Sequence, residues 1–421
     1  MRGPLLEILE RGNPGHPAIE TPGATVSVGR LCELARAERA AARLGGAAPM
    51  ICSRELVSFV VRILAFDGVV KAFHITSAAS EIPADWPTLS AGRFAGGRVP
   101  GTETVWVLAT SGTTGTPKLI EHTLDSLTAT TKSARSGAPV PRWGLLYDPA
   151  RFAGLQVVLQ SLLGGGTLVA SGLDDLEGAL RFFRARGVSS LSGTPSYWRK
   201  ILMTSAGQDL ELRQITLGGE IADQPLLDAL AQQFPASAIR HIYASTEAGV
   251  GFSVGDGRAG FPASYLEDSD RLGVELRVDR ESHLLVRRAG TTAVGLQEMT
   301  PDGFLDTLDV VEQVGDRIHF LGRENGTINV GGNKVHPEMI EQVLCSHAEV
   351  AAARVFGKPN PIMGNLVMAE ILPKSAASAT LLDEVKSLCK SRLLPWQRPV
   401  TIRTVASLSV NNSGKLGRRH E

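Results

Sequence analysis

Residues 104–118 of the chain read Thr-Val-Trp-Val-Leu-Ala-Thr-Ser-Gly-Thr-Thr-Gly-Thr-Pro-Lys. The first six are mostly apolar, which predicts a buried strand. The next nine form a loop of five hydroxyl residues, two glycines, one proline and one lysine: Thr110, Ser111, Gly112, Thr113, Thr114, Gly115, Thr116, Pro117 and Lys118. Glycine lets backbone N–H groups approach an anion, hydroxyls donate to phosphate oxygens, and lysine adds positive charge. The stretch therefore predicts a phosphate-binding loop.

The loop differs from the Walker A type, in which Gly-Lys is followed by Ser or Thr. Here Pro117 precedes Lys118 and Leu119 follows it, so a P-loop phosphotransferase is excluded. The alternative is an ordinary solvated loop rich in Ser, Thr and Gly. A strand before the loop, and a helix expected from about Thr123 to Ser133, favour the phosphate-binding interpretation.

Downstream of the loop, helical and strand-like segments alternate, which predicts an α/β fold with a mostly parallel sheet covered by helices. We expect helices at 154–163, 176–186 and 196–204, and strands at 167–171 and 188–192. Short alternating patterns at 273–278 and 284–287 indicate a small β subdomain.

A polar turn at 322–326 precedes a compact α+β unit. We therefore predict a large N-terminal domain at 1–323 and a small C-terminal domain at 324–421. A chain of 421 residues is too long for one typical core.

Charge and cysteine content exclude several classes of protein. Lys plus Arg and Asp plus Glu both number 43, so no global field favours nucleic acid or an anionic membrane. The longest apolar run, 56–66, is too short to span a bilayer, and the N-terminus lacks the apolar region of a signal peptide. The four cysteines show no CxxC spacing, which fits a reducing cytoplasm.

Further motifs follow the loop in a fixed order. They are Leu217-Gly218-Gly219-Glu220, Tyr243-Ala244-Ser245-Thr246-Glu247, Asp306-Thr307-Leu308-Asp309, Gly322-Arg323, Gly331-Gly332-Asn333-Lys334-Val335-His336-Pro337 and Asn412-Ser413-Gly414-Lys415. With the loop, this series resembles the AMP-forming acyl- and aryl-CoA synthetases, relatives of firefly luciferase and of peptide-synthetase adenylation domains. The resemblance covers about residues 104 to 421.

The resemblance implies a two-step ligase with ATP and Mg²⁺. A carboxylic acid becomes its acyl-adenylate, and the acyl group then passes to the thiol of coenzyme A. It implies phosphate binding by Thr110, Ser111, Gly112, Thr113, Thr114, Gly115 and Lys118, an α-phosphate contact by Thr246, and Mg²⁺ binding by Glu247. Because adenylation joins two anions, the site must neutralise charge and fix geometry.

The remaining roles are carried over in the same way. The resemblance places Tyr243, Gly219 and Glu220 beside adenine, Asp309 at the ribose, and Arg323 at the ribose or a phosphate. It places Lys415 between carboxylate and α-phosphate as a catalytic residue. The ordinary alternatives are a surface glutamate for Glu247, a structural ion pair for Asp309 and Arg323, and a lysine in a tail for Lys415.

The resemblance also implies a C-terminal domain that rotates about a hinge at Asn325. Rotation would withdraw Lys415 and bring a thiol-side loop with Gly331, Gly332 and Lys334 toward the acceptor. Asn325 stands where relatives more often have aspartate or lysine, and asparagine tolerates unusual backbone angles.

The acyl pocket departs most from the family pattern. Its candidate lining residues are Arg151, Phe152, Trp198 and Gly218, with Tyr197, Gly219 and Tyr243 beside them; the alternatives are a surface arginine and plain core packing. Leu308 replaces the glycine of the ribose motif. Because the loop begins at residue 110, earlier than in most relatives, we expect a shortened N-terminal region.

Two other functions stay open at this point. An acyl carrier protein with a phosphopantetheine thiol could accept the acyl group instead of coenzyme A. A non-catalytic ligand-binding relative is the other alternative, although Lys118, Glu247 and Lys415 are all present. The sequence identifies neither the acid nor the oligomeric state.

Overall fold

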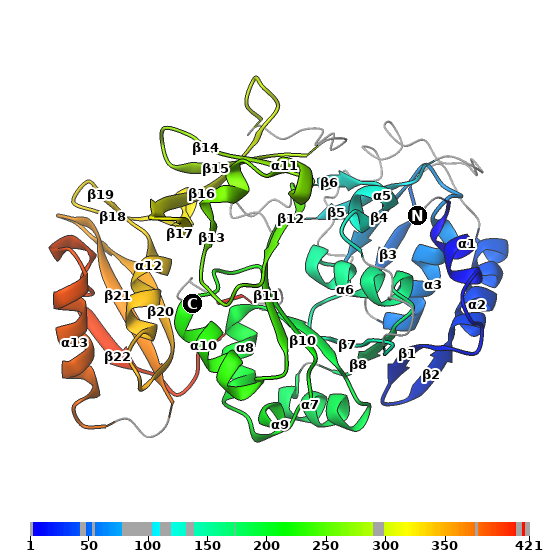
Figure 1. The fold of residues 1–421 in the computed structure, drawn as a ribbon, viewed down its shortest axis with the longest axis horizontal. Helices are drawn as coiled ribbons and strands as arrows, with labels where there is room; N and C mark the ends of the chain where they lie inside the picture. The colour runs from blue at the N-terminus through cyan, green and yellow to red at the C-terminus, as the bar shows by residue number, and fades with distance from the viewer. Residues whose placement is uncertain are drawn as a thin grey trace.

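The computed structural model describes residues 3–42, 48–52, 55–77, 103–109, 119–131, 139–172, 174–288, 299–374, 378–409 and 415–416. Within these residues the chain forms four β-sheets with helices packed against them (Figure 1). No helix in this part of the chain is both long and apolar enough to cross a membrane.

The largest sheet has eight strands, and its six central strands are parallel. Their order is β12 (Gly249–Val254), β11 (Ala238–Ser245), β10 (Gln214–Gly218), β9 (Ser190–Gly193), β7 (Arg142–Leu145), β8 (Thr167–Ala170), β1 (Pro17–Thr21) and β2 (Ala24–Ser27). The connecting helices are α6 (Phe152–Leu163), α7 (Leu176–Ala185), α8 (Pro195–Leu202), α9 (Ser205–Gln208) and α10 (Gln224–Gln233). The predicted α/β alternation in this region is confirmed, with element ends shifted by one or two residues.

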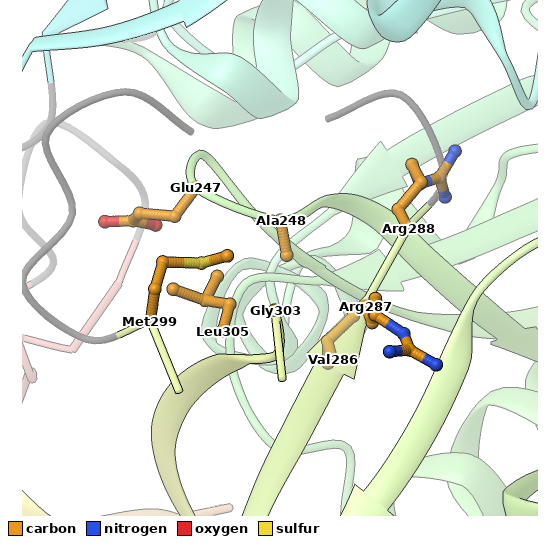
Figure 2. Close-up of a pocket in the computed structure, with 8 residues that line it drawn as sticks. All are labelled: Glu247, Ala248, Val286, Arg287, Arg288, Met299, Gly303 and Leu305. Carbon is orange, nitrogen blue, oxygen red and sulfur yellow. The ribbon is translucent and has the colours of Figure 1, made fainter. Parts of the chain in front are cut away.

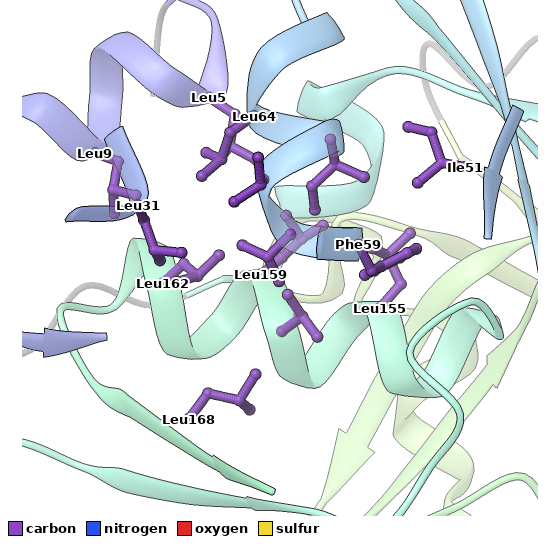
Figure 3. Packing of buried hydrophobic residues seen from close by; sticks show 14 of the residues in the cluster. Leu5, Leu9, Leu31, Ile51, Phe59, Leu64, Leu155, Leu159, Leu162 and Leu168 are labelled. Atoms are coloured by element: carbon purple, nitrogen blue, oxygen red, sulfur yellow. The ribbon is translucent and has the colours of Figure 1, made fainter. Parts of the chain in front are cut away.

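A second sheet lies toward the N-terminus. It consists of β3 (Met50–Cys52), β4 (Ala72–Thr76), β5 (Val105–Ala109) and β6 (Leu119–His122), with α1 (Leu5–Glu10), α2 (Val28–Ala41), α3 (Leu56–Phe66) and α5 (Leu124–Thr128) nearby. In Figure 3 the leucines of α6 point toward α1, α2 and α3. One apolar core therefore joins the second sheet to the first.

The phosphate-loop prediction needs one correction. We expected the loop to lead from a strand directly into a helix, but residue 119 begins β6, which pairs antiparallel with β5. The helix after it, α5, ends at Thr128 rather than near Ser133. The loop thus connects two antiparallel strands, and a helix N-terminus does not follow it directly.

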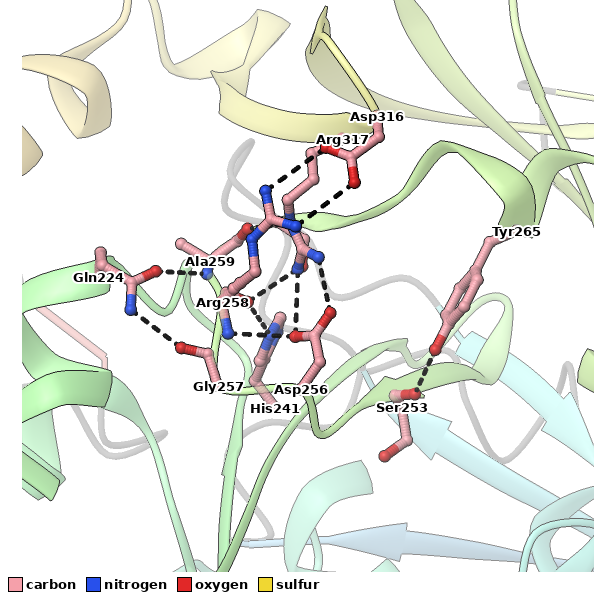
Figure 4. A network of polar contacts seen from close by, with 11 residues as sticks. Gln224, His241, Ser253, Asp256, Gly257, Arg258, Ala259, Tyr265, Asp316 and Arg317 are labelled. Carbon is pink, nitrogen blue, oxygen red and sulfur yellow. Dashed lines mark hydrogen bonds and ion pairs between the residues drawn. The ribbon is translucent and has the colours of Figure 1, made fainter. Parts of the chain in front are cut away.

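The small β subdomain is confirmed as an antiparallel sheet: β13 (Phe261–Pro262), β17 (Arg317–Arg323), β16 (Leu305–Val314), β15 (His283–Arg287) and β14 (Glu275–Val278). Two short helices, η2 (Ala263–Leu266) and α11 (Ser269–Leu272), precede β14. Figure 4 shows Arg317 anchoring this sheet: it donates to Asp256 at 2.6 Å and to the carbonyl of Ala259 at 2.9 Å. The Arg317 side chain is 3% exposed, so the pair is shielded from solvent on the arginine side.

The C-terminal part forms a fourth sheet of β18 (Ile328–Val330), β19 (Asn333–Val335), β20 (Val350–Asn360), β21 (Gly364–Pro373) and β22 (Thr401–Thr404). The helices α12 (Pro337–Cys345) and α13 (Leu381–Arg392) complete it, with the short η4 (Pro395–Gln397). Its buried cluster runs from Ile328 to Ile402 and contains no residue from before the predicted boundary. The division at 323 and 324 stays a prediction, and this separate core supports it.

Leu308, which replaces the family's glycine, has a positive backbone φ of 58°. It lies where β16 is irregularly paired with β15, between Asp306 and Val310. A left-handed conformation is costly for a residue with a Cβ and easy for glycine. The structure thus holds Leu308 in a backbone conformation that glycine adopts more readily.

We expect Leu308→Gly to be more stable than Leu308→Ala by about 1 kcal/mol, because only alanine keeps the Cβ strain. Gln313 in the same strand is the control position. There, Gln313→Ala should be more stable than Gln313→Gly by about 0.5–1 kcal/mol. Urea unfolding of the four variants measures both differences. Equal stability of the two Leu308 variants would contradict the strain.

Candidate active site

The first part of the site joins the eight-stranded sheet to the small β sheet. The Tyr243 hydroxyl in β11 donates a 2.6 Å hydrogen bond to Asp309 in β16. Arg323, at the end of β17, lies 3.2 Å from the other Asp309 oxygen and donates to the carbonyl of Thr307 at 2.8 Å. Burial raises the pKa of Asp309, while Arg323 and Tyr243 oppose that change. The predicted ribose-side residues Asp309 and Arg323 are therefore brought together with Tyr243.

The ring of Tyr243 is packed between elements rather than exposed. It lies nearly parallel to Phe252 and to Phe320, with ring centroids 5.2 Å apart in both pairs. Burial raises its pKa well above the ordinary value, and the charge of Asp309 acts in the same direction. In this structure its stacking partners are phenylalanines, so stacking on adenine stays a prediction.

Lys415 reaches the same region from the C-terminal part of the chain. A Cβ at Gly219 would lie 3.3 Å from the Lys415 Cε, and Gly219 has a φ of +83°. Burial lowers the pKa of the Lys415 ammonium, and Arg323 adds to that effect, whereas Glu220, Asp309 and Glu247 oppose it. Lys415 as a whole residue is exposed. The lowered pKa therefore reflects partial loss of water around the ammonium and not its full removal from water.

Thr246 and Glu247 lie in the turn between β11 and β12. The Thr246 carbonyl accepts a 2.8 Å hydrogen bond from Nε2 of His122 in β6. Burial lowers the pKa of His122 to about 4, so the ring is neutral and Nε2 carries the proton that the carbonyl accepts. Sequence reasoning missed His122, because a single histidine in a short strand gives no signal of its own.

Glu247 borders a small pocket that is open to solvent. The other described lining residues are Ala248, Val286, Arg287, Arg288, Met299, Gly303 and Leu305. Figure 2 shows Glu247 and Arg288 at opposite sides of this pocket. A carboxylate beside an open space suits Mg²⁺, which prefers oxygen ligands and keeps several waters. Glu247 therefore fits the predicted metal role.

A group of two aspartates and one histidine lies at the turn before β15, and its hydrogen bonds explain its arrangement. Asp279, His283 and Asp306 place ligand atoms within 4.8 Å of one another. Asp279 accepts the N–H groups of Glu281 and His283, and Asp306 accepts from the His283 ring and from the N–H of Leu308. These bonds account for the cluster without an ion.

The acyl-pocket residues stay predictions. Trp198 is fully buried, donates to the carbonyl of Thr216 at 3.0 Å, and belongs to the core cluster around α8 and α10. These contacts agree with the alternative of plain core packing. Arg151 caps the start of α6 and Phe152 is 9% exposed, 5.6 Å from the His122 ring. Gly218 ends β10 and is half-buried.

The predicted hinge and thiol-side loop lie beyond Arg323. Asn325 is the exposed middle residue of η3 (Glu324–Gly326). Gly331 and Gly332 form the two-residue turn between β18 and β19, with φ values of 58° and 88°, as a tight hairpin turn requires. Lys334 is paired with Glu324. The hinge and thiol-side roles stay predictions.

The loop residues Thr110, Ser111, Gly112, Thr113, Thr114, Gly115 and Lys118 lie outside the described residues, as do Asn412, Ser413 and Gly414. The roles that the motifs give them stay predictions. Lys415 itself is described, together with Leu416.

Residues 53–276, more than half of the chain, match the family model described as AMP-binding enzyme. Residues 339–415 match the AMP-binding enzyme C-terminal domain. The chain belongs to the AMP-binding enzyme family. The family predicted from the motifs is thereby confirmed.

Curated relatives include two CoA ligases. The chain is 30% identical over 333 residues to a probable 2-succinylbenzoate–CoA ligase of Mycobacterium tuberculosis, covering 74% of this chain and 82% of that protein. It is 27% identical to the 4-chlorobenzoate–CoA ligase of Arthrobacter, covering 75% of this chain and 65% of that protein. Surfactin synthase subunit 1 of Bacillus subtilis is 26% identical over 75% of this chain, but the chain spans 10% of its length.

Solved structures confirm the fold class. The anthranilate CoA ligase AuaEII in complex with anthranoyl-AMP has a TM-score of 0.75 at 17% identity, covering 98% of this chain and 95% of that one. An o-succinylbenzoate coenzyme A synthetase from Bacillus subtilis, solved with ATP and magnesium, has a TM-score of 0.69 at 19% identity, covering 99% and 98%.

We expect Tyr243→Phe to lower the free energy of unfolding by about 1–3 kcal/mol, because the partly buried Asp309 loses a donor. The KM for ATP should rise as well if Asp309 holds the ribose. Tyr265→Phe is a matched control, since its hydroxyl makes a longer 3.3 Å bond to the Ser253 carbonyl. Chemical unfolding and ATP kinetics test this. A larger loss for Tyr265→Phe would contradict it.

The rate of adenylate formation should fall as the pH rises. Its midpoint should lie below 10.5, the ordinary pKa of lysine, because burial lowers the pKa of Lys415. The charged ammonium neutralises the reacting anions, so activity is present below the folded pKa and lost above it. Rates of adenylate formation across about pH 7 to 10 measure the midpoint. Lys415→Arg, however slow, should not lose activity over this pH range, because arginine stays charged. If the rate falls at the same pH in both proteins, a group other than Lys415 causes the fall.

Proposed function

We propose that this protein is an AMP-forming acid–thiol ligase. It would convert a carboxylic acid and ATP into an acyl-adenylate and pyrophosphate, and then transfer the acyl group to coenzyme A with release of AMP. The observation that carries the proposal is the placement of Lys415 against Gly219, within electrostatic reach of Asp309 and Glu247. A cation delivered from the far end of the chain into a carboxylate-lined site suits a reaction between two anions.

In the first step, a carboxylate oxygen of the acid attacks the α-phosphorus of ATP. The bond from that phosphorus to the bridging oxygen breaks, and pyrophosphate leaves with the electron pair. Lys415 would hold the carboxylate and the α-phosphate together and offset their repulsion. Asp309 and Arg323 would position the ribose. Bound Mg²⁺ would add positive charge at the phosphates, held by Glu247.

In the second step, the thiol sulfur attacks the acyl carbon and AMP departs with the acyl–oxygen bond's electrons, while the thiol proton is released. We propose that the C-terminal domain, 324–421, turns about Asn325 between the steps. Lys415 lies at Gly219 in the structure, which supports a role for it in the first step. The exposed turn at Gly331 and Gly332 would serve the second step.

The acceptor and the acid are proposed from the relatives. The Mycobacterium tuberculosis and Arthrobacter relatives are CoA ligases of aromatic acids by their names, so we propose coenzyme A and an aromatic acid. A carrier-protein thiol is the alternative acceptor that the test must distinguish. All four cysteines are free thiols, which supports a reducing, cytoplasmic location.

The test measures pyrophosphate release with ATP and Mg²⁺ across aromatic, short-chain, medium-chain and long-chain acids and amino acids, with and without coenzyme A. We expect one class of acid to be accepted and an acyl-CoA thioester to form only when coenzyme A is added. Adenylate without thioester would point to a carrier-protein acceptor. ATP binding with no pyrophosphate release from any acid would contradict the ligase function.

Lys415→Ala should separate the two steps. We expect it to slow adenylation by about 100-fold or more, while thioester formation from preformed acyl-adenylate and coenzyme A stays close to wild type. Single-turnover assays of each step measure this. Equal loss in both steps would argue against a role confined to adenylation.

A further inference from the structure

Glu220 makes two hydrogen bonds that join distant parts of the chain. Its Oε1 accepts the backbone N–H of Leu416 at 2.7 Å, and its Oε2 accepts the backbone N–H of Ser196 at 2.9 Å. Ser196 lies in the first turn of α8, while Leu416 directly follows Lys415. One carboxylate therefore ties the segment that carries Lys415 to the N-terminal part of the fold.

The neighbouring Gly219 makes room for the same segment. Its backbone φ of +83° suits glycine, and a Cβ there would stand 3.3 Å from the Lys415 Cε. The Lys415 side chain thus passes over Gly219 while the backbone of Leu416 is held by Glu220. Bonds between a carboxylate and backbone N–H groups are among the stronger hydrogen bonds in proteins.

We propose that Glu220 is a positioning residue that docks the Lys415–Leu416 segment for adenylation. The inference rests on the proposed function, and it replaces the adenine-side role first expected for Glu220. Both carboxylate oxygens already accept from the protein in the structure. Glu220 would act through Lys415 and would not touch the reacting atoms.

Helix α8 makes a second contact with the C-terminal part of the chain. Arg199 in α8 donates to the carbonyl of Ala351 in β20 at 3.1 Å and is paired with Asp223. The docked arrangement is thus held at two points, by the bond from Leu416 to Glu220 and by the bond from Arg199 to Ala351. If the C-terminal domain turns away for thioester formation, the bond from Leu416 to Glu220 breaks, whereas the bond from Ser196 lies within the N-terminal part and survives. Glu220 therefore matters to the first step alone.

The first test needs no substrate. Hydrogen exchange of the Leu416 amide, followed by mass spectrometry with fragmentation of the C-terminal peptide, is compared in the wild type, Glu220→Gln and Glu220→Ala. We expect faster exchange in both variants, by about 10-fold or more for loss of a bond to a charged acceptor. Glu211→Gln, an exposed glutamate on the loop before β10, is the matched control and should exchange as wild type does. Unchanged exchange in both Glu220 variants would overturn the docking.

The second test uses the acid with the highest rate of pyrophosphate release. We expect Glu220→Gln to slow single-turnover adenylation by about 10- to 100-fold, and to leave thioester formation from the preformed adenylate unchanged. In a Lys415→Ala background the same change should cause no further loss, because Glu220 acts through Lys415. Equal losses in both steps, or a full additional loss in the Lys415→Ala background, would overturn the proposal.

The two tests distinguish a failure of the proposed function from a failure of the docking role of Glu220. If no acid is activated, the proposed function fails while the exchange result still decides whether Glu220 docks the segment. Thermal melting of each variant identifies a protein that does not fold, and in that case Glu220→Gln, the near-isosteric change, decides the question.

Discussion

The hydrogen bond from Tyr243 to Asp309 is the contact on which the arrangement of the site depends. It spans 2.6 Å between β11 of the parallel sheet and β16 of the antiparallel sheet. Phe252 and Phe320 pack along the Tyr243 ring, one from each sheet. Arg323 completes the contact where the chain passes toward the C-terminal part. Two sheets and a domain junction are thus fixed around one partly buried carboxylate.

A buried carboxylate is costly unless charge and hydrogen bonds compensate it. Asp309 has Arg323 and the Tyr243 hydroxyl for this purpose, and Lys415 adds a further positive charge. The negative charges of Glu220, Asp309 and Glu247 in turn favour the charged form of Lys415, while Arg323 opposes it. These opposed charges favour the docked position of the C-terminal segment even without substrate. Binding of an anionic nucleotide would change the balance, which gives a physical basis for a movable domain.

Some structural features were invisible in the sequence because they depend on distant partners. Leu308 adopts a left-handed backbone that its identity does not indicate, and it does so where the pairing of β15 and β16 is irregular. Trp198 packs in the core with residues of α10, a contact that residue spacing alone does not show. The strand β6 was missed because a four-residue strand has no periodicity to detect.

The sequence by itself determined the family, the α/β class and the order of the motifs, because these are carried by local patterns of apolar, glycine and hydroxyl residues. It also pointed to Asp309, Arg323, Glu247 and Lys415 as members of one site. Only the tertiary structure decided that Lys415 lies against Gly219, and that Glu220 accepts the backbone N–H of Leu416 beside it. The physical reason is that a side chain's role is set by which donors and charges surround it, and those come from residues nearly two hundred positions away.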